Sequence, residues 1–210
     1  MPFQKAHASI VRSIRQVSLL REWHRARRDR DLPDISDFVP DERAGDAADI
    51  LIAQVQRADG AVRYHCHIAG ERVQQLYGRA MPGLGLHDCL DQPMADAARP
   101  IWDACINHRL PVYTIIALAD ANGCPVTVEQ IFLPYRGNTG VAADFMLAGV
   151  HAWSTEGRFV SQGLLRGVTK IPLHWAVIID PAMKRESGAA RAADADDVVF
   201  DDTLAPSPAR

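Results

Sequence analysis

The sequence predicts an α+β domain: a five-stranded antiparallel sheet with helices on one face, preceded by an N-terminal amphipathic helix. Hairpin signals support this prediction, because Asp59-Gly60 and Asn122-Gly123 each separate two strand-like segments. Helical patterns fill the interval between the two hairpins. Strands and helices do not alternate one by one, as they would in a doubly wound parallel sheet. The strands are therefore expected to pair antiparallel.

The composition is that of an ordinary globular protein. Hydrophobic residues make up 48% of the 210-residue chain and charged residues 23%. The formal net charge of -3 predicts no general affinity for nucleic acid or for an anionic membrane. Apolar runs fall short of the ~20 residues of a membrane span, and the N-terminus lacks the apolar centre of a secretory signal. A cytoplasmic protein is expected, and its cysteines, which form no CxxC pair, are expected to be reduced and mostly buried.

Residues 1–33 are predicted to hold the amphipathic helix. Its apolar side chains recur at steps of three or four residues, namely Ile10, Ile14, Val17, Leu20 and Trp23. This apolar stripe is costly to leave in water. We therefore expect the helix to pack outside the core and to form a homodimer, with folding back onto its own sheet as the alternative. The seven arginines between residues 12 and 30 are expected on its solvated flank.

Three further regions follow the helix. Residues 34–155 contain all five predicted strands and the helices between them, and form the main domain. Residues 156–185 are predicted to be a C-terminal extension packed on or near this domain. Residues 186–210 are rich in Ala, Asp and Pro with few large apolar side chains, which indicates a disordered acidic tail.

The segment His65-Cys66-His67 raises the question of a metal site. On a strand the two histidines share one face and Cys66 points to the other. Two histidines at this spacing can ligate a metal, but a closed zinc site needs two further ligands. The rest of the sequence offers no paired Cys/His motif. We therefore predict no metal site and place Cys66 in the core.

Motifs for catalysis are also missing from the sequence. It contains neither a glycine-rich phosphate loop nor a GxSxG nucleophile elbow. Cys105 and His108 end the longest helical pattern and could face a cofactor such as haem. A histidine at that end of a helix is more simply explained by the helix dipole. No catalytic residue is predicted.

Three blocks of residues accompany the order strand-strand, helices, then three strands. They are Trp23, Arg27, Leu32-Pro33, Asp37 and Pro40; His67, Ala69-Gly70, Val73, Tyr77-Gly78 and Gly83; and Phe132-Leu133-Pro134. With these blocks and this order of elements, the chain resembles the PAS-like family of small, mostly single-domain alphaproteobacterial proteins over about residues 20–155. In two places the chain departs from the family pattern: His67 replaces a common arginine and Glu71 the usual threonine.

The resemblance implies a non-enzymatic sensory or regulatory module that binds a small ligand, a signalling protein partner, or both. A ligand would lie between the sheet and the helices, where the candidate lining residues are Tyr64, Cys66, Tyr77, Trp102 and Ile106. Its identity, and that of any cofactor, is left open. The alternative is a small enzyme or a cofactor-carrying protein, for example with haem, that encloses a cavity at the same place. Its acid or base would have to be His65, His67, His87, His108 or His151.

Overall fold

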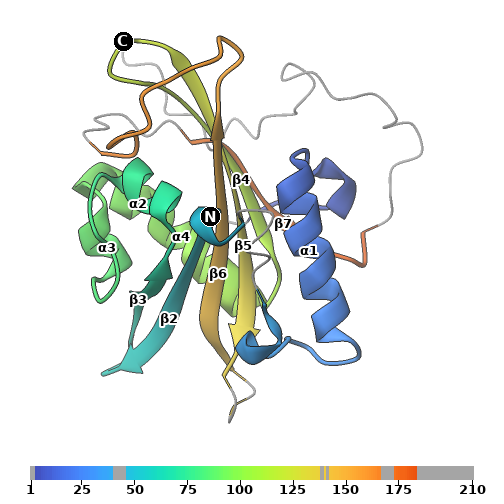
Figure 1. The fold of residues 1–210 in the computed structure, drawn as a ribbon. Coiled ribbons are helices and arrows are strands. Elements are labelled where there is room, and N and C mark those ends of the chain that lie inside the picture. The colour runs from blue at the N-terminus through green and yellow to red at the C-terminus, as the bar shows by residue number, and fades with distance from the viewer. Residues whose placement is uncertain (1–2, 40–45, 138–139, 141, 167–172, 184–210) are drawn as a thin grey trace, which may run out of the picture.

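The computed structural model describes residues 3–39, 46–137, 140, 142–166 and 173–183. A seven-stranded sheet forms its centre, in the order β1-β7-β4-β5-β6-β2-β3. Helices cover both faces of this sheet (Figure 1). The elements are β1 (Lys5–Ala6), α1 (Ile14–Arg27), β2 (Ile50–Ala58), β3 (Ala61–Ala69), α2 (Glu71–Tyr77), α3 (Leu86–Cys89), α4 (Gln92–His108), β4 (Val112–Ala119), β5 (Pro125–Arg136), β6 (Ala143–Trp153) and β7 (Leu173–Ile179).

The predicted fold class is confirmed, although the sheet has two more strands than predicted. The five predicted strands lie side by side in the order β4-β5-β6-β2-β3, and every neighbouring pair is antiparallel. β7 extends the sheet by pairing antiparallel with β4. The two-residue strand β1 then pairs parallel with β7, so the sheet is not purely antiparallel.

Both predicted hairpins form. In the β2–β3 turn, Asp59 and Gly60 have φ angles of 52° and 75°, as expected where both turn residues must adopt positive φ. In the β4–β5 turn, the Asp120 carboxylate accepts hydrogen bonds from the backbone N–H groups of Asn122 and Cys124, at 2.8 and 2.9 Å. This carboxylate fixes the loop that the Asn-Gly pair predicts.

Helices α2, α3 and α4 form the predicted crossing on one face of the sheet (Figure 1). α2 ends at Gly78, whose φ of 66° is the left-handed conformation expected of a glycine C-cap. α4 is one helix that runs through Pro100. None of the described helices is long and apolar enough to cross a membrane.

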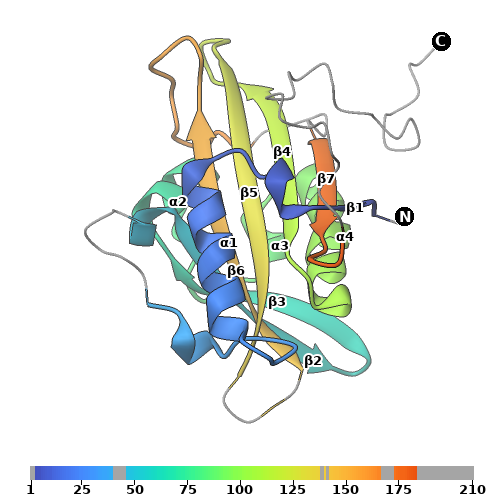
Figure 2. The same cartoon turned by 90° about the vertical axis from the view of Figure 1, so that its right-hand side faces the viewer.

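Helix α1 covers the opposite face and lies along β5 and β6 (Figure 2). It buries Leu19, Leu20 and Trp23 against the sheet of its own chain. This is the arrangement that the sequence left as the alternative. The predicted apolar stripe is wrong at two positions. Ile10 lies in a separate short 3-10 helix, Ala8–Ile10, and Ile14 is the first residue of α1 and is 87% exposed.

The described part of the C-terminal extension packs on the domain. Leu164 and Leu165 are buried, and the backbone N–H of Leu165 donates to the Leu76 carbonyl at 2.9 Å. Further along, β7 supplies the strand beside β4. The predicted disordered tail, residues 186–210, lies outside the described residues.

Candidate functional site

The predicted ligand-lining residues all lie in the layer between the sheet and helices α2 to α4. Tyr64 and Cys66 come from β3, Tyr77 from the end of α2, and Trp102 and Ile106 from α4. Each is at most 7% exposed. The rings of Tyr64 and Trp102 meet edge to face, with centroids 5.5 Å apart. Burial raises the pKa of the Cys66 thiol to about 12, so this sulfur is an inert core group.

A small cavity lies in this layer, and two of the five predicted residues, Tyr77 and Trp102, line it. The other three are packed in the surrounding core. The cavity measures about 30 Å³, which is room for about two water molecules. Typical ligand pockets start at about 300 Å³. A ligand of the size of haem would therefore have to displace side chains to enter this space.

The polar group of this cavity is Gln130, in the middle of β5 and only 6% exposed. Thr114 Oγ1 donates to Gln130 Oε1 at 3.3 Å across the β4–β5 pair. Tyr77 is hydrogen-bonded to the same glutamine, and burial raises the pKa of its hydroxyl. The sequence reasoning missed Gln130 and Thr114. Both are uncharged polar residues inside largely apolar strands, and this pattern could have indicated them.

The histidines considered as acid or base lie away from this cavity. His67, His87 and His108 are exposed, while His65 and His151 are partly exposed. None of these five lines the cavity. Within the described residues, no three His, Cys, Asp or Glu side chains are grouped as metal ligands. All four cysteines are unpaired, and three of them are buried, as predicted.

A second polar group lies on the opposite face of the sheet, beneath α1. Glu129 of β5 is 4% exposed. Its carboxylate accepts a hydrogen bond of 2.6 Å from the Tyr113 hydroxyl and one of 3.0 Å from Trp153 Nε1. Burial, followed by the bond to this carboxylate, raises the pKa of Tyr113. Three strands are therefore joined by one buried carboxylate.

Gln16 connects α1 directly to the backbone of the sheet. Its side-chain Nε2 donates to the carbonyl oxygens of Glu129, at 3.2 Å, and Gly149, at 2.9 Å. These carbonyls belong to the adjacent strands β5 and β6. The side chain is 1% exposed, so the two bonds lie out of contact with solvent. The position of α1 is therefore tied to two central strands.

Two of the blocks that resemble the PAS-like family also meet at α1. The indole Nε1 of Trp23, which is fully buried, donates to the Pro134 carbonyl at 2.8 Å. The Arg27 guanidinium lies over the Trp23 ring, 5.5 Å from its centroid. Beyond the helix, the Arg136 N–H donates to the Pro33 carbonyl at 3.0 Å. The first and third blocks, more than 100 residues apart in the sequence, are thus joined directly by the hydrogen bond from Trp23 to Pro134.

The strand order and the helices that cover the sheet define an α+β fold of the PAS type. The family model of the PAS domain matches residues 11–150, more than half of the chain, and the chain belongs to this family. A solved structure entitled "Structure of an RNA-binding Light-Oxygen-Voltage Receptor" aligns at 20% identity with a TM-score of 0.36. The alignment covers 57% of this chain and 35% of the receptor chain. No curated protein gives a significant match.

Proposed function

We propose that this PAS domain is a non-enzymatic regulatory module in which binding on the α2–α4 side of the sheet alters how α1 is held on the other side. One observation carries the proposal: Gln16 of α1 is hydrogen-bonded to the backbone of β5 at Glu129, the residue beside Gln130. A shift of β5 caused at Gln130 would therefore act on the bonds that hold α1.

The packing supports coupling across β5. Successive side chains of a strand point to opposite faces, so Glu129 enters the α1 side and Gln130 the α4 side. Close-packed interiors transmit small displacements, because few voids absorb them. Both side chains are hydrogen-bonded to neighbours on β4. A change in one core would thus alter the geometry of the other.

The input is proposed to be an unidentified signalling protein in the cytoplasm, or a small ligand that opens the core. The cavity has room for about two waters, so a ligand must displace side chains to enter. Met94 lines the cavity and is the side chain best suited to move, because methionine is unbranched and adaptable. Binding of a partner to the outer surface of the helices would need no such opening.

Hydrogen exchange on the full chain tests the coupling. Gln130→Leu removes the polar group of the cavity and breaks its bonds to Thr114 and Tyr77. We expect α1 amides to exchange about fivefold faster, which corresponds to a local loss of about 1 kcal/mol. Ile116→Val, a small apolar change in the same cavity, is the matched control. Equal acceleration in every element, or an unchanged α1, contradicts the coupling.

Native mass spectrometry of the full chain, purified from its own host, separates the two kinds of input. A mass excess that disappears on denaturation indicates a bound small molecule. A chain that carries no excess favours the protein partner as the input.

A further inference from the structure

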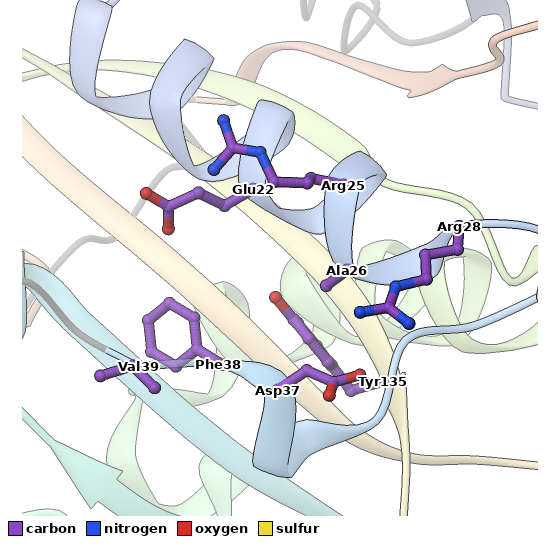
Figure 3. Close-up of a pocket in the computed structure, with 8 residues that line it drawn as sticks. All are labelled: Glu22, Arg25, Ala26, Arg28, Asp37, Phe38, Val39 and Tyr135. Atoms are coloured by element: carbon purple, nitrogen blue, oxygen red, sulfur yellow. The ribbon is translucent and has the colours of Figure 1, made fainter.

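A larger hollow lies outside the core described so far, between α1 and the connector that follows it. Its volume is about 310 Å³, which is the lower end of the range for small-molecule sites. α1 contributes Glu22 and Arg25, the residues after it Arg28 and Phe38, and the end of β5 Tyr135 (Figure 3). The cavity under α4 measures only about 30 Å³, so the larger volume of this pocket indicates a separate binding site on the α1 side.

The floor of the pocket is a buried phenol. Tyr135 is 1% exposed, and its hydroxyl points up toward α1 in Figure 3. Among the described residues, no hydrogen bond is made by this hydroxyl, and it is not one of the buried polar atoms that lack a partner, which are Gln16 Oε1 and Arg136 Nε. The hydroxyl therefore reaches the open space of the pocket, where a ligand can accept from it. Burial, followed by the nearby carboxylates of Glu22 and Asp37, raises the pKa of Tyr135, so the hydroxyl keeps a proton to donate.

The rim of the pocket carries an excess of unpaired positive charge. Within the described part of the chain, Arg25 and Arg28 make no hydrogen bond or close ion pair, although the pKa of Asp37 is lowered first by the hydrogen bond from Arg30 and also by the nearby charge of Arg28. Asp37 is already neutralised by Arg30 Nη2, which lies 2.5 Å from its carboxylate. Glu22 is then the one lining carboxylate left to balance the two arginines. This arrangement favours a ligand with a single negative charge.

Arg28 is held in a backbone conformation that disfavours a side chain. It is the C-cap residue of α1, with φ of 52° and ψ of -124°, and glycine is the usual residue at positive φ beyond a helix end. Strained non-glycine residues concentrate at ligand sites. Figure 3 shows the Arg28 guanidinium on the side of the pocket that holds Asp37 and Tyr135.

We propose that this pocket binds a small aromatic monocarboxylate. Its ring packs against Phe38, which already meets Tyr135 edge to face at 6.3 Å. Its carboxylate is bound by the Arg28 guanidinium, which offers paired donors, while the Arg25 guanidinium lies beside Glu22 at another end of the pocket (Figure 3). The Tyr135 hydroxyl donates to the same carboxylate from below. Glu22 disfavours a second negative charge, so a dicarboxylate binds less well.

Calorimetric titration of the full chain tests the proposal with benzoate and 3-phenylpropionate as probes. Benzamide and 3-phenylpropionamide are the matched neutral probes. We expect at least one acid to bind, and to bind about tenfold more tightly than its amide, the usual scale of a hydrogen-bonded charge. Arg28→Gln is expected to weaken that acid about tenfold, and Tyr135→Phe about threefold to tenfold.

Arg21→Gln is the matched control, because Arg21 is an exposed arginine of α1 that does not line the pocket. It should leave the affinity unchanged, and thermal melting confirms that each variant is folded. Three results overturn the proposal: neither acid binds at millimolar concentration, acids and amides bind equally, or Arg28→Gln and Arg21→Gln have the same effect.

Discussion

Glu129 and Gln130 are neighbours in β5, and their side chains enter two different cores. Glu129 lies under α1 and accepts hydrogen bonds from Tyr113 and Trp153. Gln130 lies under α4 and is bonded to Thr114. Glu129 is 4% exposed and Gln130 6%. In the proposed function, this pair of adjacent buried polar residues makes β5 the strand that couples the two faces of the sheet.

Among the hydrogen bonds of the tyrosine side chains, the one from Tyr113 to Glu129 should contribute most to the free energy of unfolding. Tyr113→Phe is expected to cost about 1.5–3 kcal/mol of unfolding free energy, because a buried carboxylate loses a donor. Tyr64→Phe removes a bond of the same 2.6 Å length to Asp103. That carboxylate is partly exposed and keeps Arg99 as a partner, so the expected cost is below ~1 kcal/mol. Urea denaturation measures both, and equal costs would contradict the ranking.

Alkaline pH should unfold the chain cooperatively. Each of the four tyrosines, Tyr64, Tyr77, Tyr113 and Tyr135, has its pKa raised above the ordinary value of 10.0, chiefly by burial. The folded state then holds its protons more tightly than the unfolded state. The resulting stability is complete below pH 10 and declines as the pH rises above it.

Tyrosinate absorbance near 295 nm, followed together with circular dichroism, tests the alkaline prediction. We expect the two signals to change in one shared transition above about pH 10. A gradual rise of tyrosinate absorbance while the far-ultraviolet signal is still native would show that at least one tyrosine titrates freely.

The strands and the crossing could be predicted because they depend on local pattern. Strand-like segments and two turn signals predicted the five strands β2 to β6, including the β2–β3 and β4–β5 hairpins. β7 is a short apolar run that fits a strand or a docking segment equally well. β1 has two residues and exists because it pairs with β7. Such pairing is a tertiary effect without a local signal.

The sites were harder to predict, because they depend on which segments fold back on one another. All five predicted lining residues are buried, but only two of them, Tyr77 and Trp102, line the cavity. In the sequence, nothing distinguishes Gln130 from other polar residues, because its burial depends on the packing of α4 over β5. Tyr135 gains its pocket when the segment holding Phe38 crosses beside α1. Periodicity indicates burial but does not show whether packing leaves a space.

Arg28→Gly should stabilise the protein by about 1 kcal/mol. The substitution removes a positive-φ strain of about 1–3 kcal/mol, offset in part by the chain entropy of glycine, about 0.5–1 kcal/mol. Arg28→Ala is the matched control, because it removes the same side chain but keeps the Cβ atom. Thermal and urea unfolding of the two variants decide the matter. If glycine is no more stabilising than alanine, the backbone at Arg28 is not strained.

Homodimer formation remains a proposal, and the structure changes the surface it would use. The stripe of Leu19, Leu20 and Trp23 is buried in the chain's own sheet. The exposed Ile14 of α1 is available instead. We expect light scattering to give twice the chain mass of 23.1 kDa, and Ile14→Glu to reduce it to one chain. Val160→Glu, at another exposed apolar residue, should leave the dimer intact. A wild-type mass of one chain rules the dimer out.

Gly149→Ala should release α1 from the sheet. A Cβ atom at this position of β6 would overlap the Leu19 side chain and lie 2.9 Å from Gln16 Oε1. Overpacking of this kind costs about 1–3 kcal/mol. Because both neighbours belong to α1, the loss should appear there first, as faster amide exchange in α1 with little change in β2 and β3. Gly137→Ala is the matched control, since its nearest neighbour is the Asp144 carboxylate at 3.4 Å, the end of a flexible side chain. Unchanged exchange in α1 of the Gly149→Ala variant would mean that the helix is not held by this contact.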